Sequence, residues 1–475
     1  MIEAMYTTPL KKTKIVATIG PVTESQEILE QLSLAGLDFA RLNMSHGDIK
    51  EHQKKINTIR AVVAKTGKRI GIIQDLAGPK IRTGDFYQER VVVAEGDAFT
   101  FTTKKCLGDE KRAYINYDKL PKEVKRGSII MLDDGKKKFE VLRVVGNEIV
   151  CRTVVGGELK GRRGVNVPGA HLSISSLTEK DKKDLMLGIK NKVDYVALSF
   201  VRTVKDVEDL RKILVKAKAK CGIIAKIETE EAVVDIDDII EACDAIMVAR
   251  GDLAVEIGPE KVPAVQKMII KKCNDKGKPV ITATQMLESM IHSPTPTRAE
   301  VSDVANSILD GTDAVMLSEE TTLGHYPLKA VETMVSVALQ TEKSVKHDFH
   351  SGHKNTVVDS VSLAVASVAE KVSAKAIFAL SESGFTARMI SRHKPAQPIM
   401  VLSPHENICN VSLLSFGCYP TLVKPFKNIQ DTFPAVKKIA LEQGLAKTGD
   451  KVVVAGGMPF GHIGGTNMMI IVTID

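Results

Sequence analysis

Eight short apolar runs constrain the fold of this chain more than any other feature of its sequence. They are rich in Val, Ile, Leu and Ala, and they lack the alternation of apolar and polar residues that would leave one face of a strand in water. Each run therefore predicts a parallel strand that is buried on both faces. The runs lie at residues 14–19, 39–42, 69–73, 193–198, 222–227, 245–249, 279–283 and 314–317.

Most of these runs precede a segment with helical periodicity and its own start signal. The start signals have the spacing of a capping box or a related N-cap, and they are Thr23 with Gln26, Thr178 with Glu179 and Asp181, and Thr297 with Glu300. Eight strand and helix units in this order predict an α/β fold, a closed (β/α)8 TIM barrel. The functional residues of such a barrel lie at the C-terminal ends of its strands.

The residues that follow the eight runs are almost all charged, hydroxylated or amide-bearing. They are Gly20, Arg41, Asn43, Ser45, His46, Asp75, Ser199, Phe200, Arg202, Lys226, Glu228, Arg250, Gly251, Asp252, Thr284, Ser318 and Glu320. Glu228 and Asp252 come from neighbouring strands, and Mg²⁺ prefers one or two carboxylates together with substrate oxygens. Lys226 and Arg41 would face the remaining negative charge of a phosphorylated substrate. The amides that open the helix at Gly251 can hold a carboxylate or a phosphate.

Between residues 79 and 175 the barrel pattern is interrupted. Short β-like runs at 91–93, 99–102, 129–132, 139–145 and 149–154, separated by Gly, Asp and Asn turns, predict an inserted all-β domain. We expect it to form a small β-barrel lid over the mouth of the barrel. Arg82 and the pair Arg162 and Arg163 lie near its borders, so closure would bring positive charge onto bound phosphates and exclude water.

A third domain is predicted after the barrel in the sequence. Helix and strand patterns alternate again there, with strands expected at 376–380, 398–402, 421–423, 451–455 and 468–473. We therefore predict four segments: residues 1–78 and 176–345 form the two parts of the barrel, 79–175 the lid, and 346–475 a C-terminal α/β regulatory domain.

Composition excludes several classes of protein. Lysine and arginine exceed aspartate and glutamate by 66 to 58, Trp is absent and aromatic residues make up 4%, which argues against nucleic-acid binding. Seven cysteines without a C-x-x-C pair indicate the reduced thiols of a cytosol. The first ten residues lack the apolar core of a signal peptide, and no run approaches the roughly 20 apolar residues of a membrane span. We therefore expect a cytoplasmic protein that binds neither nucleic acid nor membrane.

Several motifs together resemble the pyruvate kinase family. They lie at residues 12–16 with 19–21, 41–47, 78–84, 225–228, 247–253 and 283–290 with 296–306, in the family's order and over nearly the whole chain. The resemblance implies transfer of the phosphoryl group of phosphoenolpyruvate to ADP, Mg²⁺ or Mn²⁺ as the cofactor, and a homotetramer. The sequence has neither a P-loop nor the protein kinase motifs. The phosphates of ADP would therefore be held by side chains and metal ions in the barrel mouth, as in the family.

The resemblance also implies roles for individual residues. Lys226 would stabilise the transferring phosphoryl group, with Arg41 and Arg82 on its other side, and Glu228 with Asp252 would bind Mg²⁺. The amides of Gly251 and Asp252, with the Thr284 hydroxyl, would hold the carboxylate of phosphoenolpyruvate. Thr284 and Ser318 would lie near the path that delivers a proton to the enolate. The nucleotide contacts would be Arg41, His46, Arg82 and Arg163. Glu319 stands beside Ser318 where the family has Gly or another small residue.

The family's monovalent-cation site would comprise Asn43, Ser45 and Asp75. Family members that need K⁺ have an acidic residue where this chain has Lys80, and typically Thr where it has Leu76. The Lys80 ammonium group can supply the charge that K⁺ otherwise brings. We therefore expect that K⁺ is not required.

The resemblance places an effector site on the loop at 381–387. Ser381, Ser383 and Thr386 would bind a phosphate, since hydroxyls and free amides converge where a helix begins. Glu382 would repel a second phosphate, and the loop at 456–462 has neither the Trp nor the Arg of family members that fructose 1,6-bisphosphate activates. The sequence therefore favours AMP or a sugar monophosphate as the effector.

Two alternatives remain open from the residues. A Mg²⁺-dependent aldolase or lyase that stabilises a pyruvate enolate on a TIM barrel would share the carboxylates Glu228 and Asp252, but it would need neither Lys226 nor the lid. A binding protein without catalysis is the other alternative. The presence of Lys226, Glu228, Asp252 and Thr284 argues against it.

Overall fold

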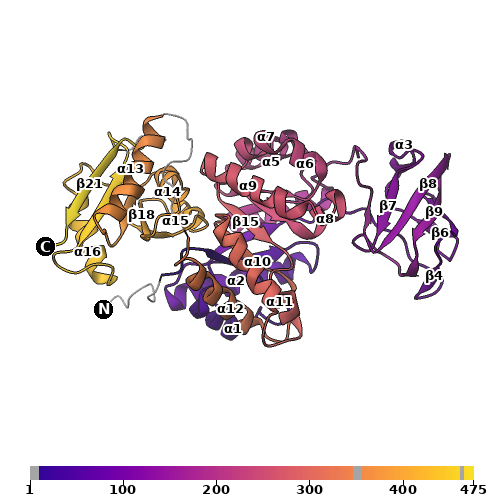
Figure 1. Cartoon of the computed structure of the whole chain (residues 1–475), viewed down its shortest axis with the longest axis horizontal. Coiled ribbons are helices and arrows are strands. Elements are labelled where there is room, and N and C mark those ends of the chain that lie inside the picture. The colour runs from indigo at the N-terminus through magenta and orange to yellow at the C-terminus, as the bar shows by residue number, and fades with distance from the viewer. Residues whose placement is uncertain (1–9, 346–355, 461–464) are drawn as a thin grey trace.

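The computed structural model describes residues 10–345, 356–460 and 465–475. Figure 1 shows three bodies along the long axis, with the barrel in the middle, a β domain at one end and an α/β domain at the other. The expectation that the first residues form no signal peptide falls largely on residues 1–9, outside the described residues. The predicted domain boundary at 345/346 borders segment 346–355, which lies outside the described residues. His462, in the loop at 456–462, also lies outside the described residues.

Every one of the eight apolar runs forms a strand of a closed parallel barrel. The predicted TIM barrel is therefore confirmed. Its strands are almost wholly buried, as expected when helices cover the outside and side chains fill the inside. Going round the barrel, the order is β1 (Lys14–Thr18), β16 (Ala314–Leu317), β15 (Val280–Ala283), β14 (Ala245–Ala249), β13 (Gly222–Ile227), β12 (Tyr195–Leu198), β3 (Gly71–Asp75) and β2 (Phe39–Asn43).

Helices surround this barrel, and two of the three predicted start signals are confirmed. Thr178 and Thr297 form capping boxes with Asp181 and Glu300. The helices are α1 (Gln26–Ala35), α2 (Ile49–Thr66), α4 (Glu179–Lys190), α5 (Val204–Lys216), α6 (Glu230–Val234), α7 (Ile236–Ala242), α8 (Arg250–Ile257), α9 (Val262–Lys276), α10 (Arg298–Leu309), α11 (Glu319–Thr322) and α12 (Pro327–Thr341), with a 3₁₀ turn η1 (Glu288–Ile291).

The third predicted start signal, Thr23 with Gln26, is wrong. Ser25 is the N-cap of α1, and its side chain accepts from the Ile28 N–H. Thr23 is fully buried, and its Oγ1 donates to the Thr321 carbonyl at 2.7 Å. This long-range contact ties the loop after β1 to α11, and it outweighs the local capping pattern.

The inserted β domain follows β3. It comprises a six-stranded sheet in the order β11-β7-β8-β9-β5-β6 and a two-stranded ribbon of β10 and β4, around a core of its own. The elements are β4 (Val91–Val93), β5 (Ala98–Thr102), β6 (Arg112–Tyr114), α3 (Leu120–Glu123), β7 (Ile129–Leu132), β8 (Lys137–Val145), β9 (Glu148–Val155), β10 (Gly157–Leu159) and β11 (Val165–Asn166). The five predicted runs are all strands, and the short strands β6, β10 and β11 were not predicted.

The C-terminal domain is a five-stranded sheet in the order β19-β18-β17-β20-β21 with helices on its faces. The elements are α13 (Val357–Lys371), β17 (Ile377–Leu380), α14 (Phe385–Ser391), β18 (Ile399–Ser403), α15 (Glu406–Ser412), β19 (Cys418–Leu422), α16 (Thr432–Glu442), β20 (Lys451–Gly456) and β21 (Met468–Thr473). The strand predicted at 421–423 begins earlier, at Cys418. Pro420 argued against a strand at this position, because proline lacks the N–H that a central strand needs. β19 is an edge strand, where the missing N–H is tolerated.

The barrel and the C-terminal domain share a core. Leu413 and Leu414, which follow α15, pack among the side chains inside the barrel. The Tyr195 hydroxyl, at the start of β12, donates to the Val411 carbonyl at 3.0 Å. The C-terminal domain therefore closes the end of the barrel opposite to the C-terminal ends of the strands. In the described part of the chain no helix is long and apolar enough to cross a membrane.

Candidate active site

Lys226, near the C-terminal end of β13, is the centre of a buried network of polar side chains. Its Nζ donates to Ser199 Oγ at 2.7 Å and lies 2.9 Å from Glu228 Oε1 and 3.4 Å from Asp75 Oδ1. Burial alone would lower the pKa of Lys226, but Asp75 and Glu228 outweigh burial and raise it. The ammonium group is therefore charged at neutral pH, and residues from the ends of three strands hold it in place.

Asp75, at the end of β3, is shared by two cations. Arg41 Nε donates to Asp75 Oδ2 at 2.6 Å, and Nη1 of the same side chain donates to Thr18 Oγ1 at 2.9 Å. Burial alone would raise the pKa of Asp75, but Lys226 and Arg41 outweigh burial and hold the pKa below its ordinary value. Asp75 is therefore an anion that fixes the two cations relative to each other.

The other residues predicted for a monovalent cation are Asn43, at the end of β2, and Ser45, on the loop that follows. Asn43 Oδ1 accepts from the Ser45 N–H at 3.1 Å. Ser45 also lines a cavity of about 340 Å³ together with Lys80 and Arg82. Of the residues predicted for the cation site, Ser45 and Lys80 thus meet at one cavity, whereas Asp75 is engaged by the cations described above.

Glu228 and Asp252 follow the adjacent strands β13 and β14. The Phe200 N–H donates to Glu228 Oε2 at 2.7 Å. Burial raises the pKa of Glu228; Lys226 opposes this rise, and the charge of Asp252 adds to it. A divalent cation would relieve the repulsion between the two carboxylates, so the pair fits Mg²⁺. Among the described residues no group of three or more His, Cys, Asp or Glu side chains could hold a metal ion, and Mg²⁺ would take its other ligands from substrate and water, as it prefers.

Thr284, directly after β15, has an unusual backbone conformation. Its φ is 68°, that of Gln285 is 55°, and left-handed conformations of this kind cost of order 1–3 kcal/mol each in residues with a side chain. The Thr284 hydroxyl accepts from the Gly251 N–H at 2.9 Å and donates to the Ala283 carbonyl at 2.6 Å. The strained turn thus aims the hydroxyl at the first turn of α8, and it pairs two groups that were predicted to bind the same substrate carboxylate.

Arg250 and Ser199 are part of this site, although no role was predicted for either of them. Arg250 Nη2 donates to the Thr284 carbonyl at 2.7 Å, and its Nη1 donates to Asp303 Oδ1 at 2.8 Å. It therefore stabilises the strained turn through the Thr284 carbonyl. Ser199 Oγ accepts from Lys226 and donates to the Leu76 carbonyl at 2.7 Å. The available signal was their position after a strand, which they share with many residues.

Ser318, after β16, is linked to the carboxylate of Glu320, a strand-end residue for which no role was predicted. Its N–H donates to Glu320 Oε2 at 2.7 Å, and the Leu287 N–H donates to Glu320 Oε1 at 3.1 Å. Burial raises the pKa of Glu320. Glu319, by contrast, is exposed. The carboxylate bonded to Ser318 is therefore that of Glu320.

The arginines predicted to bind nucleotide from the β domain form contacts within that domain. Arg82 Nη1 donates to the Arg162 carbonyl at 3.0 Å, and Arg163 Nη1 lies 3.8 Å from Asp133 Oδ1. The β domain extends away from the barrel along the long axis of the molecule (Figure 1). His46, on the barrel, has an exposed side chain. The structure thus brings Lys226, Glu228, Arg41 and Asp75 together, and it places Arg82 and Arg163 on a separate body.

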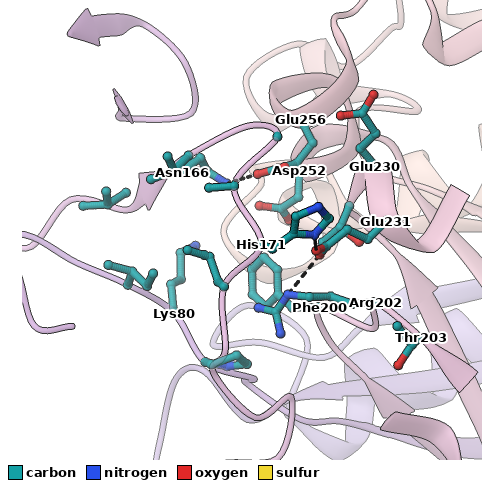
Figure 2. Close-up of a pocket in the computed structure, with 18 of the residues that line it drawn as sticks. Lys80, Asn166, His171, Phe200, Arg202, Thr203, Glu230, Glu231, Asp252 and Glu256 are labelled. Carbon is teal, nitrogen blue, oxygen red and sulfur yellow. Dashed lines mark hydrogen bonds and ion pairs between the residues drawn. The ribbon is translucent and has the colours of Figure 1, made fainter. Parts of the chain in front are cut away.

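A cavity of about 480 Å³ lies between the β domain and the mouth of the barrel. Figure 2 shows side chains from both bodies around it, including Lys80 and Asn166 on one side and Glu231, Asp252 and Glu256 on the other. Asn166 Nδ2 donates to Glu256 Oε1 at 3.3 Å, and burial raises the pKa of Glu256 to about 7. The walls include both chain segments that connect the β domain to the barrel, so the shape of the cavity depends on the position of that domain.

The predicted effector residues line a smaller cavity in the C-terminal domain. Ser381, Ser383 and Thr386 surround about 40 Å³ of space. Thr386 Oγ1 lies 2.9 Å from Thr466 Oγ1. Glu382 Oε2 lies 2.9 Å from His405 Nε2, so its carboxylate points toward the loop after β18. The structure brings these hydroxyls together at one cavity.

Comparison with known proteins gives two family matches that together span most of the chain. Residues 10–331 match the family model "Pyruvate kinase, barrel domain", and residues 359–472 match "Pyruvate kinase, alpha/beta domain". The chain is 44% identical to pyruvate kinase 2 of Synechocystis sp. over 98% of its own length and 80% of that protein. It is 44% identical to the pyruvate kinase of Geobacillus stearothermophilus, over 97% of its length and 80% of the relative. It is 41% identical to the pyruvate kinase of Clostridium perfringens, over 97% of its length and 99% of the relative.

Proposed function

The chain belongs to the pyruvate kinase family, and from this premise we propose that the Lys226 network transfers the phosphoryl group of phosphoenolpyruvate to ADP. In this reaction the bond between phosphorus and the enol oxygen breaks, a bond to the β-phosphate of ADP forms, and the enolate takes a proton to become pyruvate. The family generally uses Mg²⁺ and often K⁺. The observation that carries the proposal is the charged, buried Lys226 ammonium group, held by Asp75, Ser199 and Glu228.

Each part of the network has a role in this transfer. Lys226 and Arg41 stabilise the negative charge of the phosphoryl group, because cations that are already fixed in place need not reorganise during the reaction. Glu228 and Asp252 would hold Mg²⁺, which would supply further positive charge to the transferring phosphoryl group. Glu228 is kept in place for this role by the Phe200 N–H.

The carboxylate of phosphoenolpyruvate takes the place of an existing contact. The Gly251 N–H donates to the Thr284 hydroxyl, which donates to the Ala283 carbonyl. An incoming carboxylate at the N-terminus of α8 would replace the hydroxyl as acceptor for the N–H, and the hydroxyl would rotate to donate to it. Thr284 and Ser318 lie along the route of the proton that completes pyruvate. His46 and the lid residues Arg82 and Arg163 contact the phosphates of ADP after closure.

A coupled assay tests this function. Phosphoenolpyruvate, ADP and Mg²⁺ are mixed with the protein, and pyruvate is detected by lactate dehydrogenase and the loss of NADH. We expect formation of pyruvate and ATP in equal amounts. Release of pyruvate from a hydroxy acid without ADP would indicate the aldolase or lyase, an alternative that the comparisons do not support. Binding of phosphoenolpyruvate without turnover would indicate a protein that only binds.

We also propose that the enzyme needs no K⁺, since Lys80 lies at the same cavity as Ser45 and its ammonium group can supply the charge. Turnover is measured in K⁺-free buffer with Mg²⁺ at constant ionic strength. Stimulation by K⁺ of about tenfold or more would contradict the proposal.

The cavity at Ser381, Ser383 and Thr386 is proposed as the site of an activating monophosphate, either AMP or a ribose or hexose monophosphate. Glu382 disfavours a second phosphate there. Activation is titrated at subsaturating phosphoenolpyruvate in the wild type and in Thr386→Glu. Stronger activation by fructose 1,6-bisphosphate, or monophosphate activation that survives the substitution, would refute the assignment.

The proposed organisation follows the family. Residues 79–175 form the lid between the barrel segments 1–78 and 176–345, and residues 346–475 form the regulatory domain of a cytoplasmic homotetramer. Size-exclusion chromatography with light scattering measures the mass of the assembly. A monomer or dimer at micromolar concentration would count against the tetramer.

A further inference from the structure

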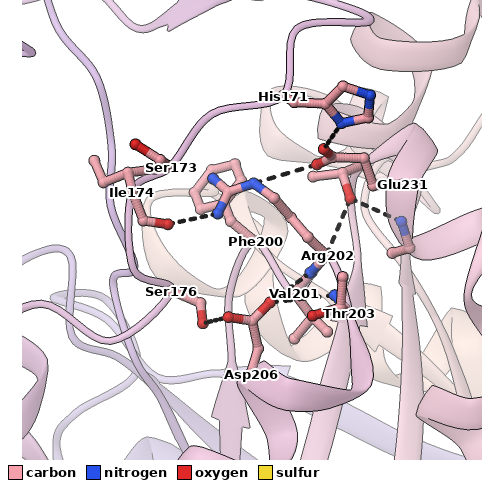
Figure 3. Close-up of polar contacts among 12 residues, drawn as sticks. His171, Ser173, Ile174, Ser176, Phe200, Val201, Arg202, Thr203, Asp206 and Glu231 are labelled. Atoms are coloured by element: carbon pink, nitrogen blue, oxygen red, sulfur yellow. Dashed lines mark hydrogen bonds and ion pairs between the residues drawn. The ribbon is translucent and has the colours of Figure 1, made fainter. Parts of the chain in front are cut away.

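Arg202 connects the barrel to the segment by which the β domain returns to it. We call residues 167–175, between β11 and the start of α4, the return linker. Arg202 Nη1 donates to the Ile174 carbonyl of this linker at 2.8 Å, and its Nε lies 3.4 Å from Glu231 Oε2. The Arg202 side chain is 12% exposed. Figure 3 shows it extended from the loop after β12 toward the linker. The guanidinium group thus binds the return linker at the Ile174 backbone carbonyl.

Further contacts hold the return linker. His171 Nδ1 lies 2.6 Å from Glu231 Oε1, so Glu231 joins Arg202 to a second point of the linker (Figure 3). On the side of the β domain, the Ser173 hydroxyl donates to Glu123 Oε1 at 2.6 Å. The linker is therefore fastened to the barrel at residues 171 and 174 and to the body of the β domain at residue 173, so the two bodies are connected over a distance of four residues.

The loop that carries Arg202 also carries the groups that hold Lys226 and Glu228. Ser199 accepts from Lys226, and the Phe200 N–H donates to Glu228. Phe200 has a φ of 52°, a left-handed conformation that its contacts must maintain. The Arg202 N–H donates to Asp206 Oδ2 at 2.9 Å, which fixes the far end of the loop. A four-residue loop thus links the catalytic network to the base of the lid.

We propose that Arg202 is a positioning residue for phosphoryl transfer, because it fixes the point about which the lid turns when it closes over the barrel. This inference deepens the proposed function and rests on it. Arg82 and Arg163 are on the β domain, so the place that they reach on closure depends on where the return linker is anchored. With the anchor at Ile174 intact, they arrive at the nucleotide phosphates. With the anchor released, the lid closes in many orientations and only a fraction of them is productive.

The proposal predicts a division between the two substrates. The groups proposed to bind the carboxylate of phosphoenolpyruvate are on the barrel. The lid arginines are proposed to contact the phosphates of ADP, and Arg82 also faces the transferring phosphoryl group. Loss of the Arg202 side chain should therefore raise KM for ADP and lower kcat, while KM for phosphoenolpyruvate stays within about threefold of wild type. A displacement of reacting groups by about 1 Å can cost roughly 10²-fold in rate, so we expect kcat/KM for ADP to fall between about 10- and 100-fold.

Arg211 offers a matched control. It follows on the next helix, α5, and it makes the same two kinds of contact, with a carboxylate at Asp244 Oδ2 (2.7 Å) and with a carbonyl at Ala242 (2.8 Å). Neither partner belongs to the β domain or to the catalytic network. Arg211→Gln therefore removes an equivalent pair of contacts without touching the lid.

The experiment compares wild type, Arg202→Gln, Arg202→Lys and Arg211→Gln. Steady-state kinetics gives kcat and both KM values, and hydrogen exchange with mass spectrometry gives the protection of residues 167–175 in the free protein. In Arg202→Gln we expect exchange in the linker to rise by about tenfold or more, with the barrel strands unchanged, together with the defect in kcat/KM for ADP. Arg202→Lys, which keeps the charge but not both contacts, should fall in between. Arg211→Gln should match wild type in both measurements.

Two results would overturn the inference: Arg202→Gln with unchanged linker exchange, or a loss of activity with unchanged KM for ADP and exchange raised across the whole barrel. The latter would indicate a residue needed only for folding. Wild-type protein without turnover of phosphoenolpyruvate and ADP would refute the proposed function instead, and the exchange comparison would still show whether Arg202 anchors the linker.

Discussion

Replacement of Lys226 by Met tests the proposed chemistry most directly. Methionine has nearly the same length and no charge, so the substitution removes the ammonium group from among Asp75, Ser199 and Glu228 with little change in volume. We expect the protein to fold and to lose almost all activity. The structure allows both parts of this expectation to be given a magnitude.

The catalytic loss follows from the position of the charge. One preorganised donor at a developing charge is worth about 10²–10³ in kcat, and Lys226 carries a full charge in a buried site. We therefore expect kcat to fall by at least about 10³-fold, or about 4 kcal/mol at 1.36 kcal/mol per factor of ten. The structural loss should be smaller. Asp75 keeps its contact with Arg41 at 2.6 Å, and Glu228, whose pKa burial already raises, can take up a proton.

The assay measures kcat, the apparent Tm and Mn²⁺ affinity in wild type, Lys226→Met and Lys278→Met. Lys278 is a matched control at the opposite end of the barrel, where its Nζ donates to the Cys243 carbonyl at 2.6 Å. We expect the Lys226→Met variant to lose activity, to melt within a few degrees of wild type, and to bind Mn²⁺ at least as well as wild type, because a competing cation has left Glu228. Retention of more than about a tenth of kcat, or loss of Mn²⁺ binding together with folding, would refute the reasoning.

Three further substitutions test other parts of the structure. The pKa of Glu256 is raised from 4.5 to about 7 by burial, so its contribution to stability is present below pH 4.5 and lost as the pH rises through 7. Glu256→Gln should therefore gain stability relative to wild type over this range, by about 3 kcal/mol, and parallel pH profiles of chemical denaturation would contradict this. Asp313 accepts from Lys394 Nζ of the C-terminal domain at 2.8 Å. Asp313→Ala should lower the free energy of unfolding by about 3–5 kcal/mol, because the buried charge of Lys394 loses its partner. An unchanged Tm would exclude this account. Leu414→Ala should cost about 2–5 kcal/mol by opening a cavity at the closed end of the barrel, and an equal effect of Leu422→Ala, an exposed position, would show that the barrel core is not involved.

The sequence by itself determined the architecture and which charged residues lie at the active site. Eight runs without alternation predicted eight buried parallel strands, since that pattern is stable only with both faces covered. The barrel geometry then placed Arg41, Lys226 and Glu228 at one mouth, because the C-terminal ends of its strands all lie on one face. Capping boxes at Thr178 and Thr297 were also predictable, since their partners lie three residues away.

Only the tertiary structure decided which of these groups contact each other. Asp75 contacts both Lys226 and Arg41, which lie 151 and 34 residues away from it along the sequence. The left-handed turn at Thr284 pairs with Gly251 in the first turn of α8, and no local pattern specifies that conformation. The contact of Arg202 with the return linker and the insertion of Leu414 into the barrel core also depend on tertiary packing, since no local sequence pattern specifies them. Local preferences decide where a helix or strand begins, but contacts between distant segments depend on how the finished elements pack, and that information is spread over the whole chain.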